Sequence, residues 1–319
     1  MSVKSRSTPS SSTQTESTGR TRRSKPAPNA APVPAQAPLD AGLYLVATPI
    51  GNLGDITLRA LDTLRRADVI ACEDSRVTGK LLAAHGIETP LTPYHEHNAP
   101  RARPKILDRI AAGAAVALVS DAGTPLVSDP GYKLVTAAVA RGLPVHALPG
   151  PSAALAALTL SGLPSDRFLF LGFLPAKSAA RRRALEEVAS LRATLIVYES
   201  ARRLAAALAD MAELLGPRPA AVARELTKLH EELRRGPLDA LAEDYRAAGP
   251  PKGEVVIVVA PPSEDAGDGL SDDALDALLQ GAMAGGSLRD AVQEVARATG
   301  RPRQEVYARA LALARDARE

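Results

Sequence analysis

A polar turn of small residues, 120–131, is the segment of this sequence best suited to binding a ligand. It follows the apolar run 116–119 and precedes a helix-like segment. A strand, a turn and a helix in this order form a ligand crevice at the carboxyl end of a strand in open α/β proteins. The turn contains Asp121 and Asp129 but no Lys or Arg. A phosphate would find no counter-charge there, so we expect a neutral or cationic small molecule.

Fingerprints of nucleotide and metal chemistry are absent from the sequence. The chain has no GxGxxG and no GxxxxGK[ST] segment, and Ser152 does not stand in a GxSxG elbow. His95 and His97 do not form an HExxH motif, and the single Cys72 lies apart from them. These absences disfavour dinucleotide, nucleoside triphosphate and metal chemistry, so we expect no bound metal.

The composition predicts a globular protein without a membrane span. The chain is 45% hydrophobic but only 3% aromatic, so its cores are expected to consist of Leu, Val and Ala. No apolar run approaches the roughly 18 residues that a membrane-spanning helix needs. A single cysteine rules out an intramolecular disulfide framework and fits the reducing cytoplasm.

Basic charge is concentrated in particular segments. Residues 1–42 hold six basic and two acidic residues, which leaves 33 basic and 34 acidic residues in 43–319. The first segment is rich in Ser, Thr, Pro and Ala and lacks a signal-peptide core, so we predict a disordered basic tail. Residues 175–235 hold 12 basic and eight acidic residues. Residues 262–285 hold six acidic and no basic residues, which predicts an acidic linker with one short helix.

Alternating strand and helix patterns define a first α/β domain over 43–164. Its strands are expected at 43–47, 69–72, 91–94, 116–119 and 144–148. Its helices are expected at 57–67, 76–85, 102–112 and 132–141, with one more after Pro149. This alternation predicts a mostly parallel sheet covered on both faces.

A second α/β domain is predicted over 165–261, followed by a small helical pair. Its strands are expected at 168–170, 194–198, 220–224 and 254–260, and its helices near 178–191, 200–215 and 237–247. Within 286–319, two helices at 286–299 and 302–316 are separated by Gly300, a natural helix stop, and Pro302, a natural first-turn residue. The predicted fold class is therefore α/β, with two α/β domains and a C-terminal helical pair.

Eight short motifs follow one another in an order that resembles a known family. They are 47–55 (ATPIGNLGD), 72–76 (CEDSR), the turn 120–131, 149–154 (PGPSAA), 172–175 (GFLP), 198–200 (YES), 224–228 (RELTK) and 251–254 (PKGE). Together they resemble the tetrapyrrole methylase superfamily, and within it the methyltransferases of 16S ribosomal RNA. The resemblance implies S-adenosylmethionine as methyl donor, bound in a cleft between the two domains. It also implies a homodimer that methylates the 2′-hydroxyl of a cytidine ribose in the 16S rRNA of the small ribosomal subunit.

The resemblance further implies which residues hold the donor. They are Pro49, Asp121, Ala122, Gly123, Thr124, Ser152, Ala153, Tyr198, Ala223 and Gly253. Gly123 would let the backbone approach the donor closely, and Asp121 would accept hydrogen bonds from its amino group. The family's Tyr-Glu-Ser-Pro-His-Arg reads Tyr-Glu-Ser-Ala-Arg-Arg over 198–203. The missing His weakens a catalytic role at that position, and Arg202 could serve the RNA backbone instead.

The expected reaction is an in-line attack of a ribose hydroxyl on the donor methyl group. Because a sulfonium leaving group is already activated, positioning can supply roughly 7–11 kcal/mol of the barrier reduction. A base helps because the hydroxyl is a weak acid, and Glu225 and Lys228 are the candidates. We expect Glu73, Asp74, Arg76 and Arg202 to bind the RNA substrate.

Two alternative functions remain open from the sequence. One is a methyltransferase that acts on a small macrocycle or a modified protein residue; the RELTK segment, the helical pair and the local basic groups argue against it. The other is a non-catalytic RNA-binding assembly factor, which would explain the basic tail but would not require the turn at 120–131. A calorimetric titration with S-adenosylmethionine separates the classes, because either enzyme should bind one donor per chain. In every case we expect a cytoplasmic protein with no membrane partner.

Overall fold

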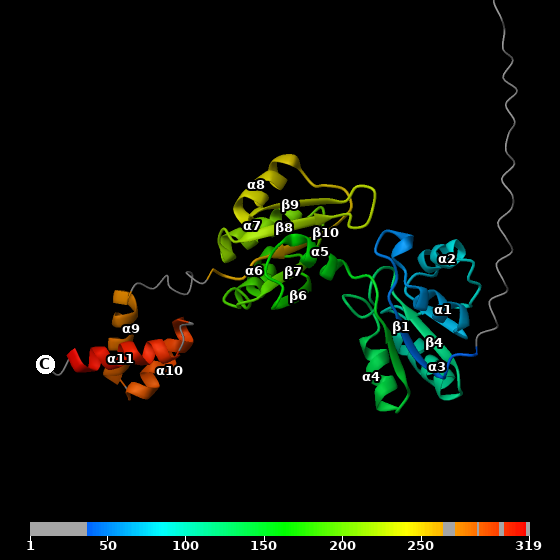
Figure 1. The fold of residues 1–319 in the computed structure, drawn as a ribbon, viewed down its shortest axis with the longest axis horizontal. Coiled ribbons are helices and arrows are strands. Elements are labelled where there is room, and N and C mark those ends of the chain that lie inside the picture. The colour runs from blue at the N-terminus through cyan, green and yellow to red at the C-terminus, as the bar shows by residue number, and fades with distance from the viewer. Residues whose placement is uncertain (1–36, 264–271, 286, 300–302, 317–319) are drawn as a thin grey trace, which may run out of the picture. The chain divides into compact units, whose positions relative to one another are not determined.

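The computed structural model describes residues 37–263, 272–285, 287–299 and 303–316 (Figure 1). Residues 39–319 form one unit by their contacts, and the description that follows concerns this unit. The predicted basic tail, 1–42, lies outside the described residues except for its last few positions.

The first sheet is parallel throughout and has the strand order β3-β2-β4-β1-β5. Strands and helices alternate along the chain, as the apolar pattern predicts. The elements are β1 (Gly42–Val46), η1 (Leu53–Asp55), α1 (Leu58–Arg66), β2 (Val69–Cys72), α2 (Ser75–Ala84), β3 (Leu91–Pro93), α3 (Ala99–Ala111), β4 (Ala115–Val119), α4 (Tyr132–Ala140) and β5 (Val145–Leu148).

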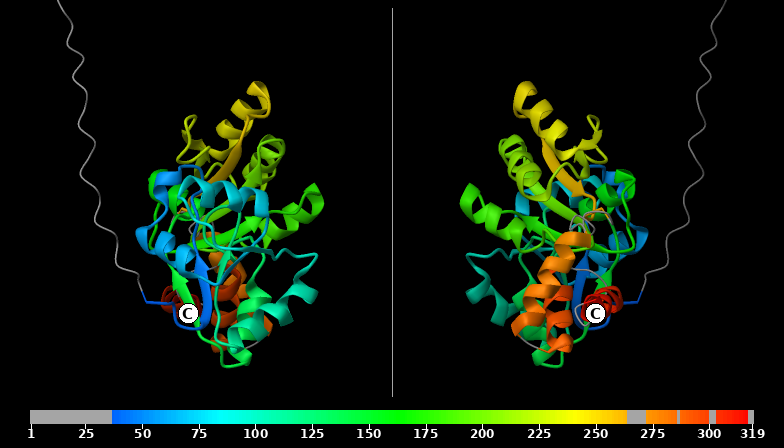
Figure 2. Two further views of the ribbon diagram at one scale, coloured as in Figure 1. Left: turned by 90° about the vertical axis from the view of Figure 1, so that its right-hand side faces the viewer. Right: turned by 90° about the vertical axis from the view of Figure 1, so that its left-hand side faces the viewer.

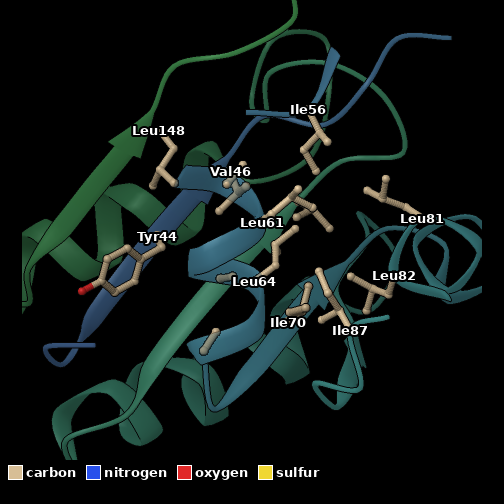
Figure 3. Packing of buried hydrophobic residues seen from close by; sticks show 14 of the residues in the cluster. Tyr44, Val46, Ile56, Leu61, Leu64, Ile70, Leu81, Leu82, Ile87 and Leu148 are labelled. Atoms are coloured by element: carbon tan, nitrogen blue, oxygen red, sulfur yellow. The ribbon is translucent and has the colours of Figure 1, made fainter. Parts of the chain in front are cut away.

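Both faces of this sheet are buried because successive side chains of a strand point to opposite sides. Val46 and Ile70 pack with Leu61 and Leu64 beneath α1 and α2, as Figure 3 shows. Their neighbours along the strands pack against α3 and α4 on the other face. The helix after β1 therefore covers one face and the helix after β4 covers the other. The loops after these two adjacent strands diverge, which creates a topological switch point where open α/β sheets bind ligands.

The second sheet is mixed, with the strand order β6-β7-β10-β8-β9. Only β6 and β7 are parallel; the other neighbours are antiparallel. The elements are α5 (Ala153–Ser161), β6 (Phe168–Phe173), α6 (Ser178–Glu186), β7 (Thr194–Ser200), α7 (Leu204–Leu215), β8 (Pro219–Arg224), β9 (Glu232–Pro237), α8 (Leu238–Ala248) and β10 (Glu254–Val259). The sequence did not predict β9, because its ELRRGP segment is polar. Polar residues are typical of an edge strand, and β9 pairs only with β8.

Helix α5 connects the two sheets. The sequence-based division places it in the first domain, 43–164, but its apolar side packs on the second sheet. Ala157 and Leu158 contact Ile196 and Val258 there. Helices α6, α7 and α8 cover the opposite face of that sheet. The chain therefore passes from one domain to the other directly after β5, at the start of α5.

The C-terminal part contains α9 (Asp272–Gly285), α10 (Leu288–Thr299) and α11 (Arg303–Asp316), coloured orange to red in Figure 2. The sequence predicted one short helix within the acidic linker 262–285; α9 is that helix, and it shares a core with the predicted pair. Leu275 and Leu279, one turn apart, contribute to that core. The acidic residues around this apolar stripe hid it in the sequence. Across the described residues, no helix is long and apolar enough to cross a membrane.

Candidate active site

The turn at 120–131 is anchored to β1 at the switch point. Thr48 and Gly123 exchange two backbone hydrogen bonds of 2.9 and 3.0 Å. The Thr48 hydroxyl donates to the Ser120 carbonyl oxygen at 3.2 Å. Gly123 has a φ of +76°, and a Cβ there would lie 3.3 Å from the Ile50 side chain. Only glycine adopts this conformation without strain, so the backbone of the turn stays bare toward the ligand crevice.

The remainder of the turn is also tightly constrained. Leu126 and Ser128 adopt left-handed φ values of +74° and +65°. Such residues cost about 1–3 kcal/mol each and persist only where the surroundings hold them. The Thr124 hydroxyl supplies one such constraint by donating to the Pro151 carbonyl oxygen at 3.0 Å. Strain of this kind concentrates at ligand clamps and active sites.

A cavity of about 800 Å³ lies beside the turn and is lined by both domains. This volume suits a nucleoside-sized ligand. Of the ten residues predicted to hold a donor, nine line the cavity: Asp121, Ala122, Gly123, Thr124, Ser152, Ala153, Tyr198, Ala223 and Gly253. Pro49 does not, although its neighbour Ile50 does. Two predicted substrate residues, Glu73 and Arg202, also line it.

Tyr198 joins β7 to the start of α5. Its hydroxyl oxygen accepts a hydrogen bond from the Ala154 amide at 3.2 Å. The rings of Phe170 and Phe173 meet it edge-on, with centroids 4.8 and 5.7 Å away. Burial raises the pKa of the Tyr198 hydroxyl, which therefore stays protonated at neutral pH. Tyr198 thus holds the first turn of α5, where Ser152 caps the helix, against the cavity.

Carboxylates dominate the first-domain wall of the cavity. Glu73, Asp121 and Asp129 all line it. Burial raises the pKa of Glu73, and the nearby charges of Asp121, Asp129 and Asp74 raise it further. Burial also raises the pKa of Asp129, partly offset by a hydrogen bond from Ser120. No group of three or more His, Cys, Asp or Glu in the described part of the chain is arranged to hold a metal ion. The three carboxylates make this wall suited to an organic cation.

Asp74 and Arg76 were predicted to bind the substrate, but neither residue lines the cavity. A substrate held within the cavity would therefore not contact them directly. Instead they pair with each other at 2.6 Å. Hydrogen bonds from the Arg76 side chain and amide lower the pKa of Asp74 to about 2. Asp74 also caps α2 and donates its amide to Asp121 at 3.0 Å, so it orients a cavity residue from behind.

Glu225 and Lys228 also lie outside the cavity lining. Glu225 Oε1 accepts from Lys228 Nζ at 2.9 Å and from the Glu254 amide at 3.0 Å. The hydrogen bond from Lys228, followed by that from Glu254, lowers the pKa of Glu225. Burial alone would lower the pKa of Lys228, but hydrogen bonds to Glu254 and Glu225 raise it overall. A carboxylate with a lowered pKa and an ammonium with a raised one are poor proton acceptors, so this arrangement does not favour the predicted catalytic role.

The Glu225 carboxylate supports the segment that carries Gly253. A Cβ on Gly253 would lie 2.3 Å from Glu225 Oε1, and Gly253 has a φ of +97°. Lys228 Nζ also bonds Glu254 Oε2 at 2.8 Å. These contacts fix the position of Gly253 in the second-domain wall of the cavity.

A group of contacts between Gly51, Asn52, Thr227 and Lys228 joins the two domains, and we call it the interdomain clasp. The Asn52 amide donates to Thr227 Oγ1 at 3.1 Å. A Cβ on Gly51 would lie 2.4 Å from Lys228 Cγ and 2.9 Å from Thr227 Oγ1. Thr227 itself has a left-handed φ of +65°. The GNLG and RELTK motifs thus meet in space and set the separation of the cavity walls.

Six of the twelve basic residues in the segment 175–235 form ion pairs within the described residues. Arg181 is only 3% exposed and bonds Asp210 at 2.6 Å. Further pairs join Arg182 to Glu213, Arg203 to Glu199 and Arg224 to Glu232. Arg202 is one of those that make no ion pair within the described residues, and it lines the cavity.

Sequence reasoning missed several residues that line the cavity. Ile50, Asp129, Phe173 and Lys252 all do so. Each belongs to one of the motifs that carried the family resemblance, so membership of a motif was the available signal. The tertiary structure was needed to show which position of each motif faces the cavity.

Comparison with known proteins places this site in a family. The model of the tetrapyrrole (corrin/porphyrin) methylases matches residues 42–242, and that of the RsmI C-terminal HTH domain matches residues 269–314. The chain therefore belongs to the tetrapyrrole methylase family, and within it to the branch of ribosomal RNA small subunit methyltransferase I. This confirms the resemblance drawn from the ordered motifs.

Two relatives named ribosomal RNA small subunit methyltransferase I show how close the similarity is. The one from Mesorhizobium japonicum is 54% identical over 282 residues, covering 88% of this chain and 95% of that protein. The one from Erythrobacter litoralis is 55% identical over 276 residues, covering 86% and 96%. A solved structure of a conserved hypothetical protein from Aeropyrum pernix K1 shares the fold, with a TM-score of 0.55, 20% identity, and coverage of 88% of this chain and 98% of that one.

Proposed function

We propose that this protein transfers a methyl group from S-adenosylmethionine to the 2′-hydroxyl of a cytidine ribose in 16S rRNA. The observation that carries the proposal is the cavity of about 800 Å³, which has an acidic first-domain wall and a second-domain side that carries Arg202 and Lys252 beside Glu199 and Glu254. Glu199 is paired with Arg203 and Glu254 with Lys228, whereas Arg202 and Lys252 make no ion pair within the described residues. These two cations suit an anionic RNA, and the acidic wall opposite suits a cationic donor. Relatives about half identical to the chain carry the name of a small subunit rRNA methyltransferase.

The residues present fit the donor. The bare backbone at Gly123 leaves room that a Cβ would narrow, and the turn bears Asp121 for a cationic group. Ala153 and Ala223 provide apolar contact for an adenine without a phosphate site. When bound, S-adenosylmethionine supplies a methyl group already activated by a positively charged sulfur.

The chain's own residues then contribute mainly positioning. The clasp and the Glu225–Lys228–Glu254 contacts hold the two walls at a fixed separation. Alignment of this kind can supply roughly 7–11 kcal/mol of the rate enhancement. Glu73 has the better setting for a proton acceptor, because burial raises its pKa and it lines the cavity.

We further propose that the protein is a cytoplasmic homodimer that acts on the small ribosomal subunit. The family resemblance implies the dimer, and the RNA substrate implies the compartment. Large apolar side chains on the outer sides of α4 and α5 support an interface between copies. Among them, Tyr132 is 71%, Val139 64% and Leu155 50% exposed. Analytical ultracentrifugation at several concentrations tests this association.

The deciding experiment transfers labelled methyl groups to small subunits from a strain that lacks this gene. Label on a ribose of 16S rRNA is the expected result. Label that enters only small macrocycles or proteins would favour the alternative methyltransferase, and absence of donor binding in calorimetry would favour the assembly factor.

A matched glycine pair ties the result to the cavity. Gly123→Ala and Gly113→Ala both place alanine at a positive φ, of +76° and +101°. A Cβ at Gly113 meets nothing within 4 Å, whereas one at Gly123 contacts Ile50 beside the cavity. We expect donor affinity to fall only in the Gly123 variant.

A further inference from the structure

Helix α3 carries a row of basic side chains that do not line the cavity. Arg101, Lys105 and Arg109 follow one another at four-residue intervals, so they lie on one side of the helix about 6 Å apart along its axis. Together with Thr92 on β3, they line a groove of about 280 Å³. No acidic residue lines this groove.

These cations differ from the ion-paired basic residues of the 175–235 segment, such as Arg181, because no acidic group within the described residues pairs with them. Within the described residues, the side chains of Arg101, Lys105 and Arg109 make no hydrogen bond or ion pair. The one acidic residue on α3, Asp108, pairs with Arg141 of the neighbouring segment at 2.8 Å. The groove therefore concentrates uncompensated positive charge in a chain whose residues 43–319 are nearly neutral.

The groove begins at the same edge of the sheet as the cavity. β3 is the edge strand and pairs in parallel with β2. The carboxyl end of β2 leads directly to Glu73, which lines the cavity, while that of β3 leads to the start of α3. A chain that leaves the cavity past Glu73 would next reach Arg101, then Lys105 and Arg109.

We propose that this α3 groove binds the phosphate backbone of the RNA next to the nucleotide whose ribose enters the cavity. The inference rests on the proposed function for the identity of the RNA, but it assigns a separate binding site. A row of cations along a helix matches a repeating polyanion, because each side chain can reach a different phosphate. A membrane surface fits less well, since an interfacial helix needs exposed apolar side chains and none of the large exposed hydrophobic residues in the described part of the chain lies on α3.

The test removes the three charges and measures the salt dependence of binding to a 16S rRNA fragment. The variant carries Arg101→Gln, Lys105→Gln and Arg109→Gln. Each lost phosphate contact reduces the slope of log K against log salt by about 0.7–0.9, so three contacts reduce it by about 2–3. We expect a flatter slope, at least a tenfold loss of affinity at low salt, and an unchanged affinity for S-adenosylmethionine.

The control removes the same charge from elsewhere. Lys80→Gln, Arg167→Gln and Arg192→Gln change three exposed residues whose side chains form no ion pair within the described residues. Its slope should stay within about one unit of the wild type, because unspecific attraction is shared across the surface. Equal slopes for the two triple variants would overturn the proposal. So would an α3 variant that loses binding to anionic vesicles but keeps its binding to RNA.

Methyl transfer provides an independent readout. The α3 variant should show a raised KM for RNA and an unchanged kcat at saturating RNA. Failure of the wild-type protein to methylate 16S rRNA would refute the proposed function, whereas the salt slope alone decides the groove.

Discussion

Substitution of Gly51 by alanine tests whether the interdomain clasp positions the reacting groups. The added Cβ would lie 2.4 Å from Lys228 Cγ, 2.9 Å from Thr227 Oγ1 and 3.0 Å from the Leu226 carbonyl oxygen. Ordinary van der Waals contact begins near 3.4 Å, so the two loops must separate by about 1 Å. Lys228 cannot rotate away freely, because its ammonium bonds both Glu225 and Glu254.

The expected effect falls on activity more than on stability. A displacement of about 1 Å at a site that works by alignment can cost about 100-fold in rate, equivalent to about 2.7 kcal/mol. The loops can part without disturbing either sheet. The free energy of unfolding should therefore fall by no more than about 1–3 kcal/mol, which is typical of overpacking. We therefore expect kcat/KM for methyl transfer to fall about 100-fold while the Tm changes by a few degrees.

The assay compares Gly51→Ala with Gly54→Ala in the same loop. A Cβ at Gly54 meets only Asn52 Oδ1, at 3.3 Å, and touches nothing in the second domain. Single-turnover methyl transfer and isothermal calorimetry with the donor should show a defect only at position 51. Equal activity of the two variants, with both folded, would refute the view that the clasp sets the cavity.

Three further predictions follow from the ionisable groups. Glu225→Gln should raise the KM for the donor and leave the shape of the pH–kcat profile unchanged, whereas loss of its acidic limb would identify Glu225 as the proton acceptor. Glu73→Gln should raise the Tm at pH 7 but not near pH 4. Burial raises the pKa of Glu73, so the folded protein favours the protonated carboxyl. The stability that this protonation gives is lost as pH rises through the folded-state pKa, and glutamine, which carries no charge, avoids that loss. A pH-independent change in Tm would contradict that assignment. Arg181→Met should lower the free energy of unfolding by about 3–5 kcal/mol, because it leaves the carboxylate of Asp210 without its buried partner; denaturant titration measures this, and Asp210→Leu in the same chain should restore part of the loss.

Local sequence patterns predicted most of the elements correctly. In the first domain, buried parallel strands read as short apolar runs between helical patterns, and all of its strands were found where expected. The edge strand β9 escaped, because its segment is polar and pairs only with β8. The helix expected within the acidic linker was found as α9, but its part in the C-terminal core was not predicted, because acidic residues surround its apolar contacts. An element that packs against a single neighbour needs few apolar residues, so its hydrophobic pattern in the sequence is weak.

The sequence by itself determined the alternation of strands and helices, the bare backbone at Gly123 and the family to which the chain belongs. The order of short motifs carried this information, because each motif is a local demand of a turn or a helix start. Only the tertiary structure decided what each charge does. It showed Arg181 neutralised in the interior, Glu225 and Lys228 bonded to each other outside the cavity, and the cations of α3 left without partners. Charge pairing depends on which distant segments meet, and that is a property of the packed chain.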